Sequence, residues 1–596
     1  MSFLKSKYRS FTCAELRKEN IGQEVTLSGW VARKRDHGGV IFVDLRDHYG
    51  ATQVVFDSDL RNQIQEVRIE SVICVKGIVR DRANDAVNPK IPTGEVEVPV
   101  TSLEILSEAK VLPFQVEDDD QAPELSRLKY RFLELRREKL HRNIMLRCKV
   151  IKEIRESMHK MGFFEFQTPI LTSSSPEGAR DYIVPSRKHP GKFFALPQAP
   201  QQFKQLIQVA GFDRYFQIAP CFRDEDARAD RSPAEFYQLD LEMSFVEQDN
   251  VLKANEQCMI DVFSAIKPGS IAEEPFPRIS YDKALEEFGS DKPDLRNPLR
   301  IKDVSSAFSQ TEFKVFKSVI DDGGKVRAIK VKLDELPPRK YFDDQIEWFK
   351  KQTGQGIAYL NFIDDEVKGT ILKFVSDKEQ QALKDLLEIE SGTNIVFFAA
   401  SKDSKILDAF GKFRNKLAED FSLLNKGQYH FVWITDYHLF EKNDEGKIEF
   451  SHNPFSMPRG GLEALNTKDP LEIYSDQYDL VCNGYELGSG AIRNYRRDIM
   501  YKAFEIAGYP NEVVDEKFGG MLNAFDFGAP PHGGFAHGVD RIVMLLSGEE
   551  TIREVIMFPF AQSCEDLMMQ APSRVDQKQL DEVHIALNLP EEESTV

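Results

Sequence analysis

The segment CFRDEDARADRSPAEFYQLDLEMSF, from Cys221 to Phe245, constrains the fold most because it combines dense charge of both signs with a strand pattern. It contains three arginines and seven acidic residues. Strand alternation in its second half predicts a core face and a polar face, which are Tyr237, Leu239, Leu241 and Met243 against Phe236, Gln238, Asp240 and Glu242. An antiparallel hairpin would also bring Arg223 and Glu225 to the cleft beside that polar face. The alternative is a hairpin whose charges only pair across a solvated surface.

Two further segments favour a site for an anionic ligand. APPHGGFAHGVDRIVMLLSG runs from small residues into Asp540 and Arg541 and then into an apolar helix. Small residues permit close approach of the backbone to a ligand, and an arginine can neutralise phosphate oxygens. Farther back, TPILTSSSPEGARDYIVPSR holds Pro169 at a predicted strand boundary and Glu177 in a polar loop.

Length and composition predict several soluble domains. A chain of 596 residues exceeds what one hydrophobic core usually supports. Its apolar runs are far shorter than the roughly 20 residues of a membrane span, and its start has no apolar signal core. The seven cysteines are scattered without close pairs, so we expect a reducing, cytoplasmic location and no zinc site.

Residues 24 to 106 read as five short strands with a helical stretch, LRNQIQEVRIE, between the third and fourth. That pattern predicts an OB-fold barrel, a common binder of single-stranded nucleic acid. The alternative is a generic small barrel with solvated arginines. The formal charge of −19 opposes nucleic-acid binding only weakly, because binding depends on local patches. One such patch is predicted from Arg33, Lys34, Arg35, Arg46, Arg80 and Arg82 beside Trp30, Phe42 and Tyr49.

The predicted fold class is multidomain α+β. We expect the OB-fold in residues 1–107, an acidic linker or hinge in 108–140, and a lysine-rich inserted α/β domain in 299–425. The remaining parts, 141–298 and 426–596, would form one domain with an antiparallel sheet flanked by helices.

Taken together, these segments resemble the bacterial-type aspartyl-tRNA synthetases, which are class II aminoacyl-tRNA synthetases. FQTPILT, FRDED with EFYQLDLE, and GVDRIVM resemble the three class II motifs. The aspartyl identity is carried by SSPEGARDYIVPSR, ALPQAPQQFKQL, GSDKPDLRNP, SHNPFSMP and NGYELGSGAIRN. The resemblance covers essentially the whole chain and implies a GAD-like inserted domain.

For ATP, the resemblance implies that Arg223 holds the α-phosphate and the reacting carboxylate, and that Arg541 holds the γ-phosphate. Phe236 would stack on adenine, with Arg541 on the other face. Asp479 and Glu486 match acids that position Mg²⁺. The full implied ATP set is Arg223, Asp224, Glu225, Ser232, Phe236, Glu486, Gly538, Val539, Asp540 and Arg541, in a motif 2 loop one residue longer than usual.

For aspartate, the resemblance implies that Lys204 and Arg493 hold the side-chain carboxylate, so that neutral asparagine would leave buried cations unpaired. The ammonium group would contact Asp240, Gln201 and Glu177, and His452 would close over the substrate. Glu486 and Arg493 are an odd number of positions apart in NGYELGSGAIRN. Strand alternation would place their side chains on opposite faces of the strand, so we expect GSG to interrupt the alternation.

For tRNA, the resemblance implies anticodon contacts in the OB-fold at Arg35, Phe42, Gln53 and Glu97. His37 resembles the variant of relaxed members that also charge tRNA(Asn), and Asp85 stands at a second position linked to that choice. The implied partners are tRNA(Asp), tRNA(Asn), a tRNA-dependent amidotransferase and a second copy of the chain. Three alternatives remain: an asparaginyl-type enzyme, a tRNA-independent adenylate-forming relative, and a non-catalytic RNA-binding derivative.

Overall fold

The computed structural model describes residues 5–116, 121–174, 179–232, 234–364, 366–443 and 445–589. The chain divides into two compact units, Met1–His141 and Arg142–Val596, each of which is described by itself. Glu177 and the acidic C-terminal residues lie outside the described part. No described helix is long and apolar enough to cross a lipid bilayer.

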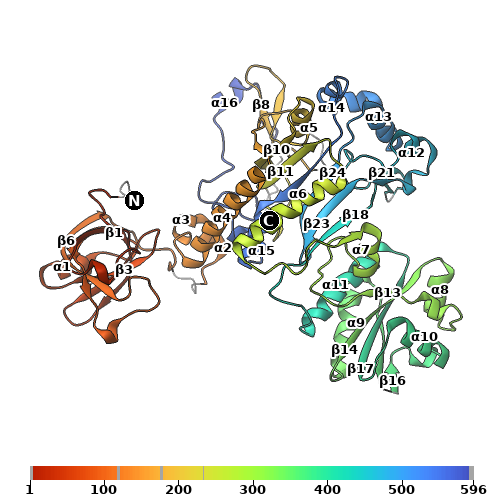
Figure 1. Ribbon diagram of the computed structural model, residues 1–596, viewed down its shortest axis with the longest axis horizontal. Helices are drawn as coiled ribbons and strands as arrows, with labels where there is room; N and C mark the ends of the chain where they lie inside the picture. The colour runs from red at the N-terminus through yellow and green to blue at the C-terminus, as the bar shows by residue number, and fades with distance from the viewer. Residues whose placement is uncertain are drawn as a thin grey trace. The chain divides into compact units, whose positions relative to one another are not determined.

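The first unit contains a closed β-barrel, as the strand pattern predicts (Figure 1). The strands run in the order β3-β2-β1-β4-β6-β5, and a parallel pairing of β3 with β6 closes the sheet. Alternate residues of β2 are buried, which gives the barrel an apolar interior. The bounds are β1 (Glu24–Asp36), β2 (Ile41–Arg46), β3 (Ala51–Phe56), α1 (Ser58–Glu66), β4 (Val72–Ile78), β5 (Arg80–Asp81) and β6 (Val96–Ser107). The predicted fourth strand is thus divided into β4 and β5.

Short helices follow the barrel within the segment predicted as a linker. They are α2 (Glu124–Lys129) and α3 (Arg131–Glu134). Arg131 and Glu134 form an ion pair of 2.6 Å in which both side chains are almost fully buried. The segment therefore has packing of its own. The long predicted amphipathic helix is α4 (Glu138–Lys160).

The second unit is organised around an eight-stranded sheet (Figure 1). Its order is β12-β18-β23-β24-β25-β11-β10-β7, with parallel pairs only at its two ends, β12–β18 and β10–β7. The bounds are β7 (Phe164–Glu165), β10 (Arg214–Phe222), β11 (Glu235–Ser244), β12 (Arg278–Ser280), β18 (Phe431–Thr435), β23 (Gln477–Cys482), β24 (Tyr485–Ile492) and β25 (His532–Gly538).

The two faces of this sheet are covered differently. Apolar residues of α4, α6 (Gln248–Ile266) and α15 (Val539–Ser547) pack with Leu239, Leu241 and Met243 in one core. The predicted core face of β11 is confirmed except at Tyr237, which lies near the loop end of the hairpin and is 38% exposed. The opposite face contacts α5 (Gln201–Val209).

An antiparallel sheet of order β13-β14-β17-β15-β16 lies within residues 299–425, the segment predicted as an inserted α/β domain and called the inserted part below. Its strands are β13 (Ile301–Asp303), β14 (Lys325–Leu333), β15 (Ala358–Ile363), β16 (Glu366–Gly369) and β17 (Thr393–Ser401). One face packs on α9 (Arg339–Thr353) and α11 (Ser404–Asp420), and the other on α8 (Lys314–Asp321) and α10 (Asp377–Leu387).

Smaller elements complete the second unit. They are β8 (Ile183–Pro185), β9 (Phe193–Ala195), α7 (Tyr281–Phe288), β19 (Tyr437–His438), β20 (Phe440–Lys442), β21 (Ile448–Phe450), α12 (Gly461–Thr467), β22 (Tyr474–Ser475), α13 (Arg497–Ile506), α14 (Asn511–Phe525) and α16 (Gln577–Glu582).

The end of α7 meets α11 through two glycines. Gly289 ends α7 in the left-handed conformation, with φ of +66°. A Cβ atom on Gly411 of α11 would lie 2.6 Å from the carbonyl oxygen of Gly289 and 2.7 Å from that of Phe288. Both are backbone atoms, which cannot move aside cheaply. Direct backbone packing therefore joins the two helices.

We expect Gly411→Ala to lower the free energy of unfolding by about 1–3 kcal/mol, the usual cost of overpacking. This sign is opposite to the helix-propensity gain of about 1 kcal/mol expected from Gly→Ala in an open helix. The matched control is Gly520→Ala in α14, where a Cβ would meet no atom within 4 Å. Calorimetric unfolding of the full chain should show a lower Tm for the first variant only. Equal effects of the two variants would contradict this packing.

Candidate functional site

The hairpin of β10 and β11, α5, β24 and the β25–α15 junction surround a cavity of about 230 Å³. The three predicted arginines Arg223, Arg493 and Arg541 line it together. The other predicted residues that line it are Gln201, Lys204, Glu225, Ser232, Phe236, Asp240, Glu486, Gly538 and Asp540. The structure therefore brings side chains from distant parts of the sequence to one place, instead of dispersing the charges over a solvated face.

The hairpin register explains the position of Arg223. Cys221 pairs with Phe236 across β10 and β11, so Arg223 follows the end of β10 close to the phenylalanine. Its guanidinium carbon lies 5.0 Å from the centroid of the Phe236 ring, and its Nε donates to the carbonyl oxygen of Gln198 at 3.3 Å. In the following loop, Glu225 accepts a 2.6 Å bond from Arg231.

The junction of β25 with α15 positions Arg541. Its Nη1 donates to the carbonyl oxygen of Glu486 at 2.6 Å, and its Nε donates to that of Asp230 at 3.1 Å. The neighbouring predicted residues behave differently. Asp540 forms an ion pair with Arg147 of α4, and the side chain of Val539 is buried in the core. Only the backbone of Val539 is thus available to a ligand.

The glycines before this junction serve strand packing. A Cβ on Gly534 would lie 2.0 Å from Oε2 of Glu242 and 2.2 Å from the carbonyl oxygen of Leu241. The expectation that these small residues admit a ligand is therefore wrong at Gly534, where the neighbouring strand occupies the space. Gly538 does line the cavity.

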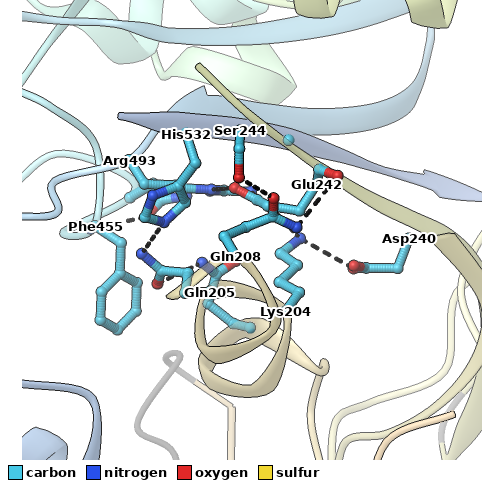
Figure 2. Close-up of polar contacts among 12 residues, drawn as sticks. Lys204, Gln205, Gln208, Asp240, Glu242, Ser244, Phe455, Arg493 and His532 are labelled. Atoms are coloured by element: carbon cyan, nitrogen blue, oxygen red, sulfur yellow. Dashed lines mark hydrogen bonds and ion pairs between the residues drawn. The ribbon is translucent and has the colours of Figure 1, made fainter. Parts of the chain in front are cut away.

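Four buried charged residues, which we call the charge network, contact one another: Lys204, Asp240, Glu242 and Arg493 (Figure 2). Lys204, Asp240 and Arg493 line the cavity. Lys204 Nζ lies 3.1 Å from Asp240 Oδ2 and 3.5 Å from Glu242 Oε2. Arg493 donates to Glu242 from Nε at 2.9 Å and from Nη2 at 3.3 Å. Each of the four side chains is at most 2% exposed, so every charge depends on its partners.

The two acids of the charge network differ in pKa. Burial raises the pKa of Asp240 to about 6, although Lys204 acts in the opposite direction. Burial also opposes ionisation of Glu242, but Arg493 and Lys204 hold its pKa below the usual value. Glu242 is therefore the fixed counter-ion of Arg493. The sequence places Glu242 on the polar face of the strand but assigns it no role. Its position two residues after Asp240, on the same face, was the feature that could have indicated one.

The predicted metal pair lies beside the cavity. Asp479 is 6% exposed, and its Oδ2 accepts a 2.8 Å bond from the hydroxyl of Tyr437. Its Oδ1 makes no hydrogen bond with the described residues. Burial and the nearby Glu486 raise the pKa of Asp479 to about 7. Among the described residues, no group of three or more acids, histidines or cysteines could hold a metal ion alone. A buried orphan oxygen beside a second carboxylate nevertheless fits Mg²⁺, which typically takes one or two carboxylates and its other ligands from phosphates and water.

A β-bulge brings Glu486 and Arg493 to the same site. Leu480 pairs with Gly488, whereas Val481 pairs with Glu486, so Leu487 is the extra residue. The expectation that GSG interrupts the alternation is therefore wrong in position. The glycines of GSG allow β25 to approach, since a Cβ on Gly490 would lie 2.2 Å from the carbonyl oxygen of Gly534.

His452 and Gln201 border a second cavity of about 610 Å³, which also contacts Asp479 and Glu486. The His452 Nδ1 and the Ser451 hydroxyl oxygen are 2.6 Å apart, and the His452 ring lies 4.9 Å from that of Tyr437. Burial lowers the pKa of His452. Gln201 borders both cavities and donates to Gln205 at 3.0 Å.

In the first unit, the predicted anticodon residues form one connected group. Arg35 donates to Gln53 at 3.2 Å, and Gln53 donates to Glu97 at 2.7 Å. Phe42 is paired with Arg35 across β1 and β2, and its ring lies 5.5 Å from that of His37. Asp85 lies in a short 3₁₀ helix, Asn84–Ala86, and no hydrogen bond in the described chain joins it to this group.

The predicted basic patch is smaller than the sequence suggests. Lys34 donates to three carbonyl groups at the end of α1, those of Ile64, Gln65 and Val67. Arg46 pairs with Glu70 at 2.8 Å. Arg82 is only 6% exposed and donates to the carbonyl oxygen of Val96. These three cations stabilise the barrel, which a count of basic residues does not reveal.

We expect Glu242→Gln to lower the free energy of unfolding by about 3 kcal/mol or more, because it leaves the buried Arg493 without its fixed counter-ion. Glu235→Gln, at the exposed start of the same strand, is the matched control and should change stability by less than about 0.5 kcal/mol. Calorimetry of the full chain can compare the two. A Glu242 variant as stable as the control would show that the charge network does not depend on this carboxylate.

Comparison with known proteins identifies the family. Residues 123–562 match the family of tRNA synthetases class II (D, K and N), and residues 25–106 match the OB-fold nucleic acid binding domain. The chain is 55% identical to the Aspartate--tRNA(Asp/Asn) ligase of Gluconobacter oxydans, over 99% of each chain. It is 54% identical to the ligase of the same name from Zymomonas mobilis, over 97% of this chain and 98% of that one.

Solved structures support the fold. Asparaginyl-tRNA synthetase from Pyrococcus horikoshii, complexed with asparaginyl-adenylate, matches with a TM-score of 0.55 at 19% identity, over 95% of this chain and 99% of that one. Aspartyl tRNA synthetase from Entamoeba histolytica matches with a TM-score of 0.56 at 18% identity, over 94% and 92%. The full-length relatives and the matched family together show that the chain belongs to the class II aminoacyl-tRNA synthetases, among the aspartate--tRNA ligases.

Proposed function

We propose that this enzyme joins L-aspartate to ATP as aspartyl-adenylate and transfers the aspartyl group to tRNA(Asp) and to tRNA(Asn). The observation that carries the proposal is the convergence of Arg223, Arg493 and Arg541 with Lys204 and Asp240 on one cavity. The class uses ATP, and the relatives' names include both tRNAs. The proposed domain limits are those expected from the sequence, with the OB-fold in 1–107 and the inserted part in 299–425.

Adenylate formation requires two anions to meet. The carboxylate of aspartate attacks the α-phosphorus, and pyrophosphate leaves in line. Arg223 would hold the α-phosphate and the carboxylate, Arg541 the γ-phosphate, and Phe236 the adenine ring. Positioning and charge stabilisation then supply most of the catalysis, without a protein nucleophile. Asp479 and Glu486 would hold Mg²⁺, which would neutralise phosphate charge when bound.

Selection of aspartate follows from the charge network. Arg493 has five N–H donors, of which those on Nε and Nη2 contact Glu242, so its Nη1 is available for a carboxylate. Lys204 would supply the second cation. Asparagine would present a neutral amide to these buried cations, which costs several kcal/mol relative to aspartate. Asp240 and Gln201, with Glu177, would receive the ammonium group, and His452 would close the site.

Recognition of tRNA is proposed for the connected group of Arg35, Phe42, Gln53 and Glu97 in the barrel. Aromatic and arginine surfaces suit splayed anticodon bases. His37 lies against Phe42 in this group, which supports a role in the choice between tRNA(Asp) and tRNA(Asn). Asp85 is proposed for the same choice on family likeness. Aspartyl-tRNA(Asn) would then need a tRNA-dependent amidotransferase as a downstream partner in the cytoplasm.

A homodimer is proposed through the β7 edge of the large sheet. β7 is the terminal strand, so its outer edge is unpaired within the described sheet. Its Phe164 is 65% exposed, and Leu171, which follows in the chain, is 52% exposed. Exposed apolar side chains beside an open strand edge suit association with a second copy.

Aspartate-dependent exchange between ATP and pyrophosphate tests the first step. We expect exchange with L-aspartate and none above background with L-asparagine. Charging of purified tRNA(Asp) and tRNA(Asn) then tests the second step. Exchange driven by asparagine would overturn the assignment of Lys204 and Arg493, and charging of tRNA(Asp) alone would overturn the relaxed specificity.

The raised pKa of Asp240 predicts the pH dependence of aspartate binding in the absence of ATP. Below its pKa of about 6, Asp240 takes up a proton and loses the charge that would face the ligand ammonium. We expect the Kd for L-aspartate, measured by calorimetry, to be constant from about pH 7 to 8 and to rise by up to about tenfold per unit below pH 6. Asp240→Asn should bind more weakly and lose this dependence. A wild-type profile that matches the variant would assign the ammonium to another group.

A further inference from the structure

Lys292 brings a further cation to the acids of the proposed metal pair. Its Nζ lies 3.4 Å from Oε2 of Glu486 and 2.8 Å from Oδ2 of Asp291, on the wall of the second cavity. The other oxygen of Glu486, Oε1, lies 4.0 Å from Nη1 of Arg541 in the first cavity. The Glu486 carboxylate therefore lies between two cations, one from each cavity. No catalytic or binding role assigned above uses Lys292.

The segment that carries Lys292 is held at several points. We call residues Gly289–Arg300, between α7 and β13, the strap. Gly289 packs on the backbone of α11, and buried Asn297 donates to the carbonyl oxygen of Arg414 in α11 at 3.2 Å. Arg414 in turn donates to the carbonyl oxygen of Leu299 at 2.9 Å. The inserted part thus fixes one side of the strap.

The large sheet fixes the other side of the strap. Arg296 makes hydrogen bonds of 2.7–3.2 Å to Asp294 and a longer one, 3.4 Å, to the carbonyl oxygen of Asn483 in the turn between β23 and β24. That turn leads directly into Glu486. Lys292 therefore lies in a segment that is hydrogen-bonded both to α11 and to the turn before β24, the strand of its partner Glu486. An ordinary surface lysine, on a free loop, would lack this preorganisation.

We propose that Lys292 is a positioning residue that holds the Glu486 carboxylate before nucleotide binds and releases it to the divalent cation that arrives with ATP, while its pairing with Asp291 persists. The inference rests on the proposed function of Asp479 and Glu486. Two adjacent carboxylates repel each other unless a cation lies between them. Asp479 Oδ1, buried and without a hydrogen bond in the described chain, is the second observation that favours an incoming cation.

Binding of Mn²⁺ to the full-length enzyme, without ATP or aspartate, tests the proposal. Lys292→Met should bind Mn²⁺ roughly five to ten times more tightly than the wild type, because it removes a cation that competes for Glu486. Lys292→Gln should behave alike, and Lys292→Arg, which keeps the charge, should bind as the wild type does. Lys283→Met is the matched control, since Lys283 is an exposed lysine of α7 that faces Glu287 at 3.6 Å.

Kinetics supply the second readout. At fixed ATP, the Mg²⁺ concentration that gives half-maximal ATP–pyrophosphate exchange should fall by a similar factor in Lys292→Met. Unchanged Mn²⁺ affinity in both neutral variants would overturn the proposal. A raised KM for ATP without tighter Mn²⁺ binding would also overturn it, because Lys292 would then be a phosphate ligand. Since Mn²⁺ binding is measured without substrates, a failure of aspartate activation would be recognised separately.

Discussion

The charge network of Lys204, Asp240, Glu242 and Arg493 is the interaction on which the rest of the site depends. Transfer of an ion from water into a protein interior costs several kcal/mol unless partners replace its hydration. Lys204 and Arg493 therefore depend on the two carboxylates of β11. Their ion pairs hold α5 and the residue after β24 against that strand. Gly534 belongs to the same arrangement, because any side chain there would collide with the Glu242 carboxylate.

Sequence reasoning predicted features that arise from local pattern. Strand alternation gave the two faces of β11 and the five strands of the barrel, since the period of two is local information. Features that depend on distant segments were missed or misplaced. The bulge at Leu487 is set by pairing with β23, and the contact of Asp540 with Arg147 depends on the position of α4. From the sequence, Lys34 belongs to a basic surface. In the structure it donates a hydrogen bond to a carbonyl group at the end of α1.

Family likeness supplied roles that local pattern could not, but it left Glu242 without one. This residue matters for the proposed selection of aspartate. Arg493 is oriented by two hydrogen bonds to Glu242 before any substrate enters, so its remaining donors are preorganised. A preorganised cation discriminates a carboxylate from an amide more sharply than a mobile one, because it cannot relax toward water when the ligand is neutral.

The inserted part acquires a physical connection to the chemistry through the strap. Its sheet has two apolar faces covered by its own helices, so its core is independent of the large sheet. The strap nevertheless makes hydrogen bonds both to α11 and to the turn before Glu486. It also places Lys292 beside the Glu486 carboxylate. The inserted part is therefore joined by hydrogen bonds to the segment that carries Lys292, although none of its own described residues lines either cavity.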